Sequence, residues 1–219
     1  MSEKKPISRG RLLFLDAIRG FAMICIVLGH LGMQQINRFV FTFHLPIFYL
    51  ITGYYINNRG TNWEFVKKKI RTLIVPYFFT CTVIVLLAFL LETVKGGSGG
   101  TAAAEWLGAS FYVAGDSYKE PFPIKGIGAI WFLWSTFWGG LLLRWLQEKH
   151  TVYQITAVLL ILLATEMSRG LFWFPLSIQT AGTSLMFMYF GYLFRKIKPQ
   201  LGKIPKWVKI AAFAAACLI

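Results

Sequence analysis

Six long runs of apolar residues, separated by short polar segments, dominate the chain. They extend over residues 12–31, 39–56, 73–91, 127–143, 152–165 and 178–194. A helix needs about 20 mostly apolar residues to cross a bilayer, and about 17 is the lower limit. Only the run 152–165 is shorter, so it is either a span that continues past Glu166 or a re-entrant segment. We favour the span because it gives a consistent charge pattern. The pattern predicts an all-α fold, a polytopic bundle of transmembrane helices.

A further apolar run extends from Val208 to Ile219, where the sequence stops. Its length is below what a bilayer crossing requires. We therefore expect six complete spans plus the start of a seventh. All of them would belong to one membrane domain over residues 1–219, the N-terminal part of a longer protein.

Lys and Arg residues are concentrated in alternate connecting segments. If the N-terminus is cytoplasmic, the inner segments hold 17 of the 23 basic residues, the outer segments hold five, and Arg19 lies within a span. Cytoplasmic loops of membrane proteins carry such an excess of Lys and Arg. The distribution predicts a multi-pass protein of the cell membrane with a cytoplasmic N-terminus.

The composition agrees with a membrane protein and excludes several other classes. Hydrophobic residues make up 56% of the chain and charged residues only 15%, against about 25% charged in ordinary soluble domains. The net charge of +14 would suggest nucleic acid in a soluble protein, but the basic residues lie between apolar runs. We therefore expect no nucleic-acid partner. Cys25, Cys81 and Cys217 lie within apolar runs without CxxC spacing, which supports neither disulfides nor a metal site.

The longest connection runs from Glu92 to Gly126 and opens with the glycine-rich segment 95–100. Such a composition is typical of a flexible linker. We expect this connection to be external and mostly a linker, with a substrate-covering role for residues 106–118 as the alternative.

Three ionisable residues interrupt the first apolar run, namely Asp16, Arg19 and His30. Charged groups within a span are costly and usually mark function. On a helix, Asp16 and Arg19 are neighbours that can pair. Arg19 and His30 are eleven residues apart, which places them within about 20° of one direction and roughly 16 Å apart along the axis. The three residues therefore form one stripe, although a purely structural ion pair is the alternative for Asp16 and Arg19.

A second histidine, His44, precedes Pro46 near the start of the second run. Proline is tolerated at the first position of a helix because its missing N–H has no partner there in any case. This reading places His44 at the outer level of His30, above the ion pair. The four residues together predict a polar passage that opens towards the cytoplasm, although His44 taken alone is more typical of a structural residue.

These residues also carry a resemblance to a known family. The segment from Arg11 to Ala22, with ten residues between Arg19 and His30, resembles the opening signature of the bacterial acyltransferase 3 family of membrane O-acyltransferases. The segment from Phe43 to Phe48 resembles its second block, and residues 69–77 and 131–133 resemble weaker ones. Residues 187–195 resemble the sugar O-acetylases related to fucose 4-O-acetylase.

The resemblance implies transfer of an acyl group, usually acetyl from cytoplasmic acetyl-CoA, to a hydroxyl of a cell-surface carbohydrate or related glycan. We expect no metal cofactor. Histidine titrates near neutral pH and suits the removal of the hydroxyl proton. His30 is our candidate base, and His44 would orient it or bind the acceptor. Arg19 would bind the donor through its fork of N–H groups, with Asp16 holding Arg19 in place.

The sequence leaves two matters open. The basic clusters at 67–69 and 195–198 would attract the phosphates of CoA, or they would only enforce the topology. A transporter or flippase that uses Asp16, Arg19 and the histidines as a solute or proton pathway is the alternative function.

Overall fold

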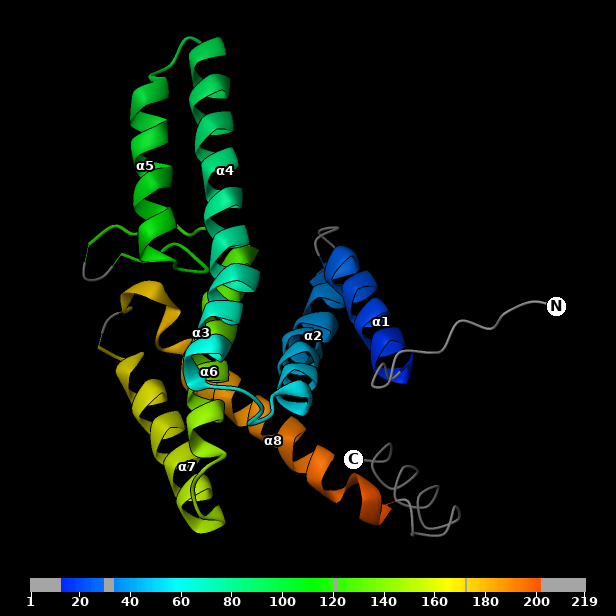
Figure 1. Ribbon diagram of the computed structural model, residues 1–219. Helices are drawn as coiled ribbons and strands as arrows, with labels where there is room; N and C mark the ends of the chain where they lie inside the picture. Colours follow the sequence, from blue (N-terminus) through cyan, green and yellow to red (C-terminus); the bar gives the residue numbers. More distant parts are fainter. Residues whose placement is uncertain (1–12, 30–33, 120–121, 172, 202–219) are drawn as a thin grey trace, which may run out of the picture.

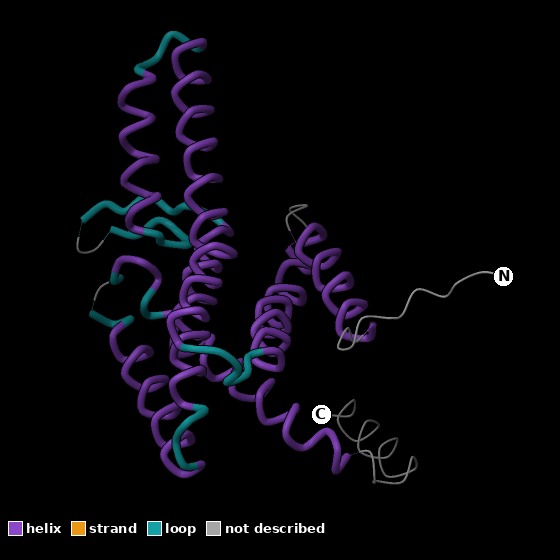
Figure 2. The backbone as a smooth tube through the Cα atoms, in the orientation of Figure 1, coloured by secondary structure: helices purple, strands orange, loops and turns teal. Residues whose placement is uncertain are grey.

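The structure is a computed structural model that describes residues 13–29, 34–119, 122–171 and 173–201 (Figure 1). Within these residues it is helical, and Figure 2 shows helices joined by loops, without a strand. The α-helices are α1 (Leu13–Gly29), α2 (Gln34–Tyr55), α3 (Asn62–Lys69), α4 (Val75–Val94), α5 (Gly99–Tyr112), α6 (Phe132–Leu146), α7 (Thr151–Ser168) and α8 (Thr180–Leu201). The predicted all-α class is confirmed. Each of the six predicted runs lies largely within one of these helices, and the seventh, 208–219, lies outside the described residues.

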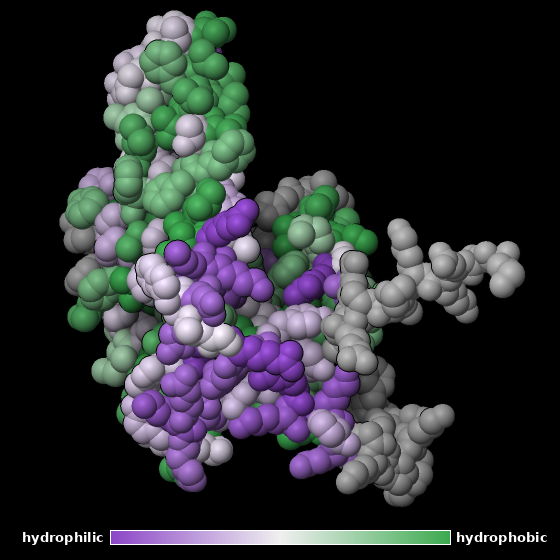
Figure 3. Space-filling view, viewed as in Figure 1, coloured by the Kyte–Doolittle hydropathy of each residue, from purple (hydrophilic) through white to green (hydrophobic). Residues whose placement is uncertain are grey.

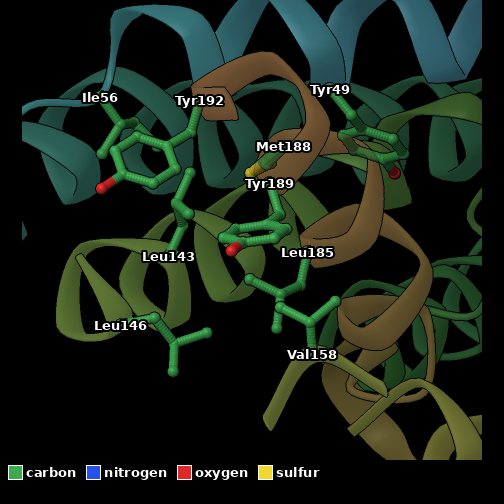
Figure 4. Packing of buried hydrophobic residues seen from close by; sticks show 9 residues of the cluster. All are labelled: Tyr49, Ile56, Leu143, Leu146, Val158, Leu185, Met188, Tyr189 and Tyr192. Carbon is green, nitrogen blue, oxygen red and sulfur yellow. The ribbon is translucent and has the colours of Figure 1, made fainter. Parts of the chain in front are cut away.

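The main core lies where α2, α6, α7 and α8 meet (Figure 4). Large apolar side chains from all four helices fill it, and burial of such groups is the main favourable term in folding. Its buried members are Tyr49, Ile56, Leu143, Leu146, Val158, Leu185, Met188, Tyr189 and Tyr192.

Two glycines allow α2 and α8 to pack unusually closely. A Cβ atom at Gly53 of α2 would fall on the backbone carbonyl of Met188, and one at Gly191 of α8 would fall on that of Leu50. Small residues at such positions let two helix backbones approach each other. The contact between α2 and α8 is the most extensive helix pairing in the described part of the chain.

The helix that contains the third predicted run begins before that run. Thr61 caps α3 in a capping box, because its side chain accepts a hydrogen bond from the Glu64 N–H and the Glu64 carboxylate accepts one from the Thr61 N–H. A π-helical turn, η1 (Ile70–Ile74), joins α3 directly to α4. The three lysines 67–69 therefore continue into the apolar helix without a break.

Two helical stretches in the described residues are long and apolar enough to cross a membrane. They are Asn62–Val94, which joins α3, η1 and α4, and Thr151–Ser168, which is α7. The run at 152–165 does continue past Glu166 in one helix, as expected.

The expectation of a flexible linker at 92–126 is wrong for much of that segment. Ser98 caps α5 by accepting a hydrogen bond from the Thr101 N–H, and the alanines that follow favour a helix. The glycine-rich segment makes only the turn, where Gly96 has a φ of 78°. The Tyr77 hydroxyl donates to the Ser110 carbonyl over 2.7 Å, so α5 returns along α4.

The expected start of the second helix is also wrong. α2 begins at Gln34, so Pro46 lies inside the helix and not at its first turn. His44 consequently lies about halfway along α2, roughly 15 Å from its first residue. The apolar periodicity of 39–56 did not include the polar residues of the first turns, which are nevertheless helical.

Candidate functional site

A basic cavity of about 360 Å³ lies where the C-terminal end of α2 meets α1, α3, η1 and α6. Five cationic side chains and one carboxylate line it. These are Arg19, Arg59, Lys68, Lys69, Arg144 and Glu64. Thr52, Tyr55, Ile56, Asn57, Phe65 and Thr72 complete the lining. Below, "the basic cavity" refers to this set of residues.

Arg19 reaches the basic cavity from α1. Its guanidinium lies 3.6 Å from the Asp16 carboxylate and 5.1 Å from the centre of the Tyr55 ring of α2. The ion pair expected between Asp16 and Arg19 is therefore present, and Arg19 also makes a cation–π contact. Its side chain is 41% exposed, so it remains accessible to a ligand.

Lys68 and Lys69 enter the basic cavity from the last turn of α3. Lys69 packs against α6, where a Cβ on Gly140 would lie 3.6 Å from its ammonium. Lys67, the preceding residue, instead lies over the Trp63 ring at 5.6 Å and does not line the basic cavity. The helix therefore divides three consecutive lysines into two that face the cavity and one that does not.

Arg144 is the least exposed charged residue of the site, with 4% of its surface accessible. Its guanidinium donates to the carbonyls of Asn57, Arg59 and Gly60 and to the Asn62 side chain, the last over 3.0 Å. Within the described residues, no carboxylate forms an ion pair with it. Arg144 thus holds the loop between α2 and α3 in one conformation.

Arg195 of α8 binds the end of α2, just before this loop. Its Nη1 donates to the carbonyls of Tyr54 and Ile56, at the last turn of α2. The last carbonyls of a helix lack intrahelical partners, and the negative end of the helix dipole lies there. The sequence predicts only a topological role for Arg144, and either that role or attraction of phosphates for Arg195. These contacts leave no motif in the sequence, because every residue type has the backbone carbonyl that accepts the hydrogen bond.

Of the two histidines, only His44 lies in the described residues, and it does not line the basic cavity. His30 lies outside the described residues. His44 is buried, and its Nδ1 lies 2.9 Å from the Val40 carbonyl, the geometry of an Nδ1–H donor. His44 and Tyr55 are eleven residues apart on α2, so they share one face at roughly 16 Å along the axis. Arg19 and His30 have the same spacing in the sequence.

Hydrophilic residues are gathered over the lower half of the view in Figure 3, while the α4–α5 hairpin above is mostly hydrophobic. The basic cavity belongs to this hydrophilic region and carries a large excess of positive charge. Arginine and lysine donors of this kind bind phosphates. The fold and the site together define a helical protein with apolar helices of membrane-spanning length and a strongly basic cavity.

Comparisons with known proteins identify the family. The acyltransferase domain family matches residues 12–219, so the chain belongs to this family of transferases, whose members are typically embedded in membranes. The nodulation protein NolL of Sinorhizobium fredii is 27% identical over 154 residues, a match that covers 59% of this chain and 37% of that protein. The chain thus matches little more than a third of the length of this relative. No solved structure matches the chain significantly.

We expect Arg144→Gln to loosen the loop between α2 and α3. The variant loses several charge-assisted hydrogen bonds to backbone carbonyls, each worth about 1.5–3 kcal/mol. Arg144→Lys should rescue only partly, because one ammonium cannot span the carbonyls that the planar guanidinium bridges. Hydrogen–deuterium exchange of residues 57–62 measures the effect. Exchange in Lys149→Gln, a change at an exposed lysine of the same end of the molecule, should match the wild type, and unchanged exchange in Arg144→Gln would contradict the assigned role.

Proposed function

We propose that the protein transfers an acyl group, usually acetyl, from acyl-CoA to a hydroxyl of a cell-surface carbohydrate or related glycan. The basic cavity is the observation that carries this proposal. CoA bears a pyrophosphate and a 3′-phosphate, and such groups favour a cluster of Arg and Lys donors. Membership in the acyltransferase family supports the reaction type.

In this proposal the phosphates of the donor bind Arg59, Lys68 and Lys69, and Arg19 binds the donor at the side of α1. Asp16 keeps the Arg19 guanidinium in place through their ion pair. Arg144 contributes by shaping the loop, since its own donors are occupied by carbonyls. The site residues predicted from sequence for the donor thus gain neighbours from α3 and from the loop after α2.

In this proposal the chemistry is carried by His44, from the middle of α2, and by His30, the residue that follows α1 in the sequence. His30 takes the proton from the acceptor hydroxyl as its oxygen attacks the thioester carbonyl, and the protonated histidine returns the proton to the departing CoA sulfur. His44 orients His30 or binds the acceptor. The stripe from Tyr55 to His44 on α2 supports this arrangement, because it leads from the basic cavity towards the other end of the helix.

We also propose that the chain crosses the membrane six times with a cytoplasmic N-terminus. The ratio of 17 inner to five outer basic residues supports this topology. Basic residues of two predicted inner segments also meet in the structure, because Arg59 and Lys68 of one line the same cavity as Arg144 of the other. A cytoplasmic cavity would face the acyl-CoA pool.

We expect Lys68→Gln and Lys69→Gln to raise the KM for acetyl-CoA, each by roughly tenfold, with a smaller change in kcat. The loss of one charge-assisted contact to phosphate, about 1.5 kcal/mol, sets this magnitude. Initial rates at varied acetyl-CoA, followed as release of free CoA, measure it in the full-length protein.

Lys67→Gln is the matched control, because Lys67 lies on the same helix turn and does not line the basic cavity. Its KM should remain that of the wild type. Acetyl-dephospho-CoA, which lacks the 3′-phosphate, identifies the phosphate that each lysine contacts. Equal effects of all three substitutions would indicate general charge attraction and refute the assigned pocket.

We expect His30→Ala to abolish acyl transfer while the amount of protein in the membrane stays the same. A base that removes the acceptor proton contributes roughly 10²–10⁴-fold to the rate. The readout is acetate on cell-surface glycan, normalised to membrane protein. Retained acetylation at normal abundance would remove His30 from the mechanism.

An orienting residue is less critical than the base, so His44→Gln should retain more activity than His30→Ala. The alternative function, a transporter, predicts that even the wild type releases no free CoA from acetyl-CoA.

We expect a cysteine introduced at Ser98 to react with a membrane-impermeant thiol reagent in intact cells, provided that any outer membrane is permeabilised. Ser98 lies in the exposed turn between α4 and α5, on the proposed outer side. A cysteine at Asn62, beside the basic cavity, should react only after lysis. The reverse pattern would invert the topology and place the donor cavity outside the cell.

A further inference from the structure

A second hollow lies on the opposite face of the α1–α2 pair and has a different chemistry. This apolar groove of about 740 Å³ is lined by α1, α2 and α8. Its lining consists of Phe14, Leu15, Ile18, Ile47, Leu50, Ile51, Tyr54, Phe190, Gly191, Leu193, Phe194 and Ile197. The Tyr54 hydroxyl is the one polar side-chain group among them, and none is charged.

The apolar groove has a packed floor and open walls. Leu15, Ile51 and Tyr54 form a buried cluster at its base. Ile18 and Phe194 on its sides are 39% and 42% exposed in the described structure. The residues at the base are therefore packed within the protein, while the apolar side chains on the sides are partly exposed at its surface.

A cation closes one end of the apolar groove. The Lys198 ammonium lies 4.9 Å from the centre of the Phe14 ring and 5.6 Å from that of Tyr54, and it donates to the Tyr54 hydroxyl over 3.2 Å. Its aliphatic stem thus follows the apolar wall while the charge remains at the rim. An ammonium has three N–H donors, and within the described residues one of them is assigned to Tyr54.

We propose that this groove binds an anionic glycerophospholipid, with an acyl chain on the apolar floor and the headgroup phosphate at Lys198. A long apolar trough with a cation at one end is complementary to a molecule with an apolar tail and an anionic head. Basic pockets between membrane helices bind anionic headgroups in this manner, and the cytoplasmic leaflet supplies them. This site is separate from the basic cavity, so the inference does not depend on the proposed acyl transfer.

Native mass spectrometry of the full-length protein in detergent tests the proposal with phosphatidylglycerol and phosphatidylcholine as probes. We expect the wild type to bind phosphatidylglycerol more tightly. Lys198→Gln should weaken binding of phosphatidylglycerol roughly fivefold and leave phosphatidylcholine unchanged, because one basic residue near an anionic headgroup contributes an effect of this size. Lys149→Gln is the matched control, since Lys149 also lies over an aromatic ring, Trp145, at 5.3 Å but away from the groove.

A second pair of variants tests the tail. Ile18→Trp should reduce binding of both lipids by filling the apolar groove, and Val27→Trp, at an exposed position of α1 outside it, should not. Retention of the phosphatidylglycerol preference in Lys198→Gln would overturn the proposal. A lipid-free dimer that Ile18→Trp dissociates would also overturn it, because a second copy would then be the occupant.

Discussion

The end of α2 is the point on which the rest of the site depends. Its last carbonyls and those of the following exposed loop have no partner within the helix. Tyr54 and Ile56 are themselves buried, and a buried carbonyl without a partner is costly. Arg144 from α6 and Arg195 from α8 bind them. Two helices that are distant in the sequence thereby fix where α2 ends and where α3 begins. The position of every α3 side chain in the basic cavity follows from that connection.

The basic cavity also shows how one protein can gather several like charges. Nearby oxygen atoms offset the repulsion between two of these charges and the others. Arg144 is surrounded by carbonyl oxygens, and Arg19 has the Asp16 carboxylate beside it. Within the described residues, no ion pair neutralises Arg59, Lys68 or Lys69. The cavity therefore combines charges that are compensated by the fold with charges left for an anionic ligand, and ligand binding would relieve the remaining repulsion.

The sequence predicts the helical class and the Asp16–Arg19 pair because both depend on local spacing. Apolar runs and an i, i+3 pair need no tertiary information. It did not predict α5 or the placement of Pro46, since a glycine-rich opening and a proline each favour a helix boundary over a helix interior. The two arginines at the end of α2 could not be assigned either, because their acceptors are backbone atoms brought close by packing. The roles proposed for His30 and His44 remain predictions.

The glycine contacts between α2 and α8 have a consequence for motion. Each backbone carbonyl that rests against Gly53 or Gly191 blocks sliding of one helix along the other. The pair therefore behaves as a rigid spine, with the core side chains packed along it. Of this pair, α2 lines the basic cavity, and α1, α3, η1, α6 and the loop after α2 supply the rest of its lining. A change in the shape of this cavity would therefore require α1, α3 or α6 to move against α2, because the close contact with α8 holds α2 in place.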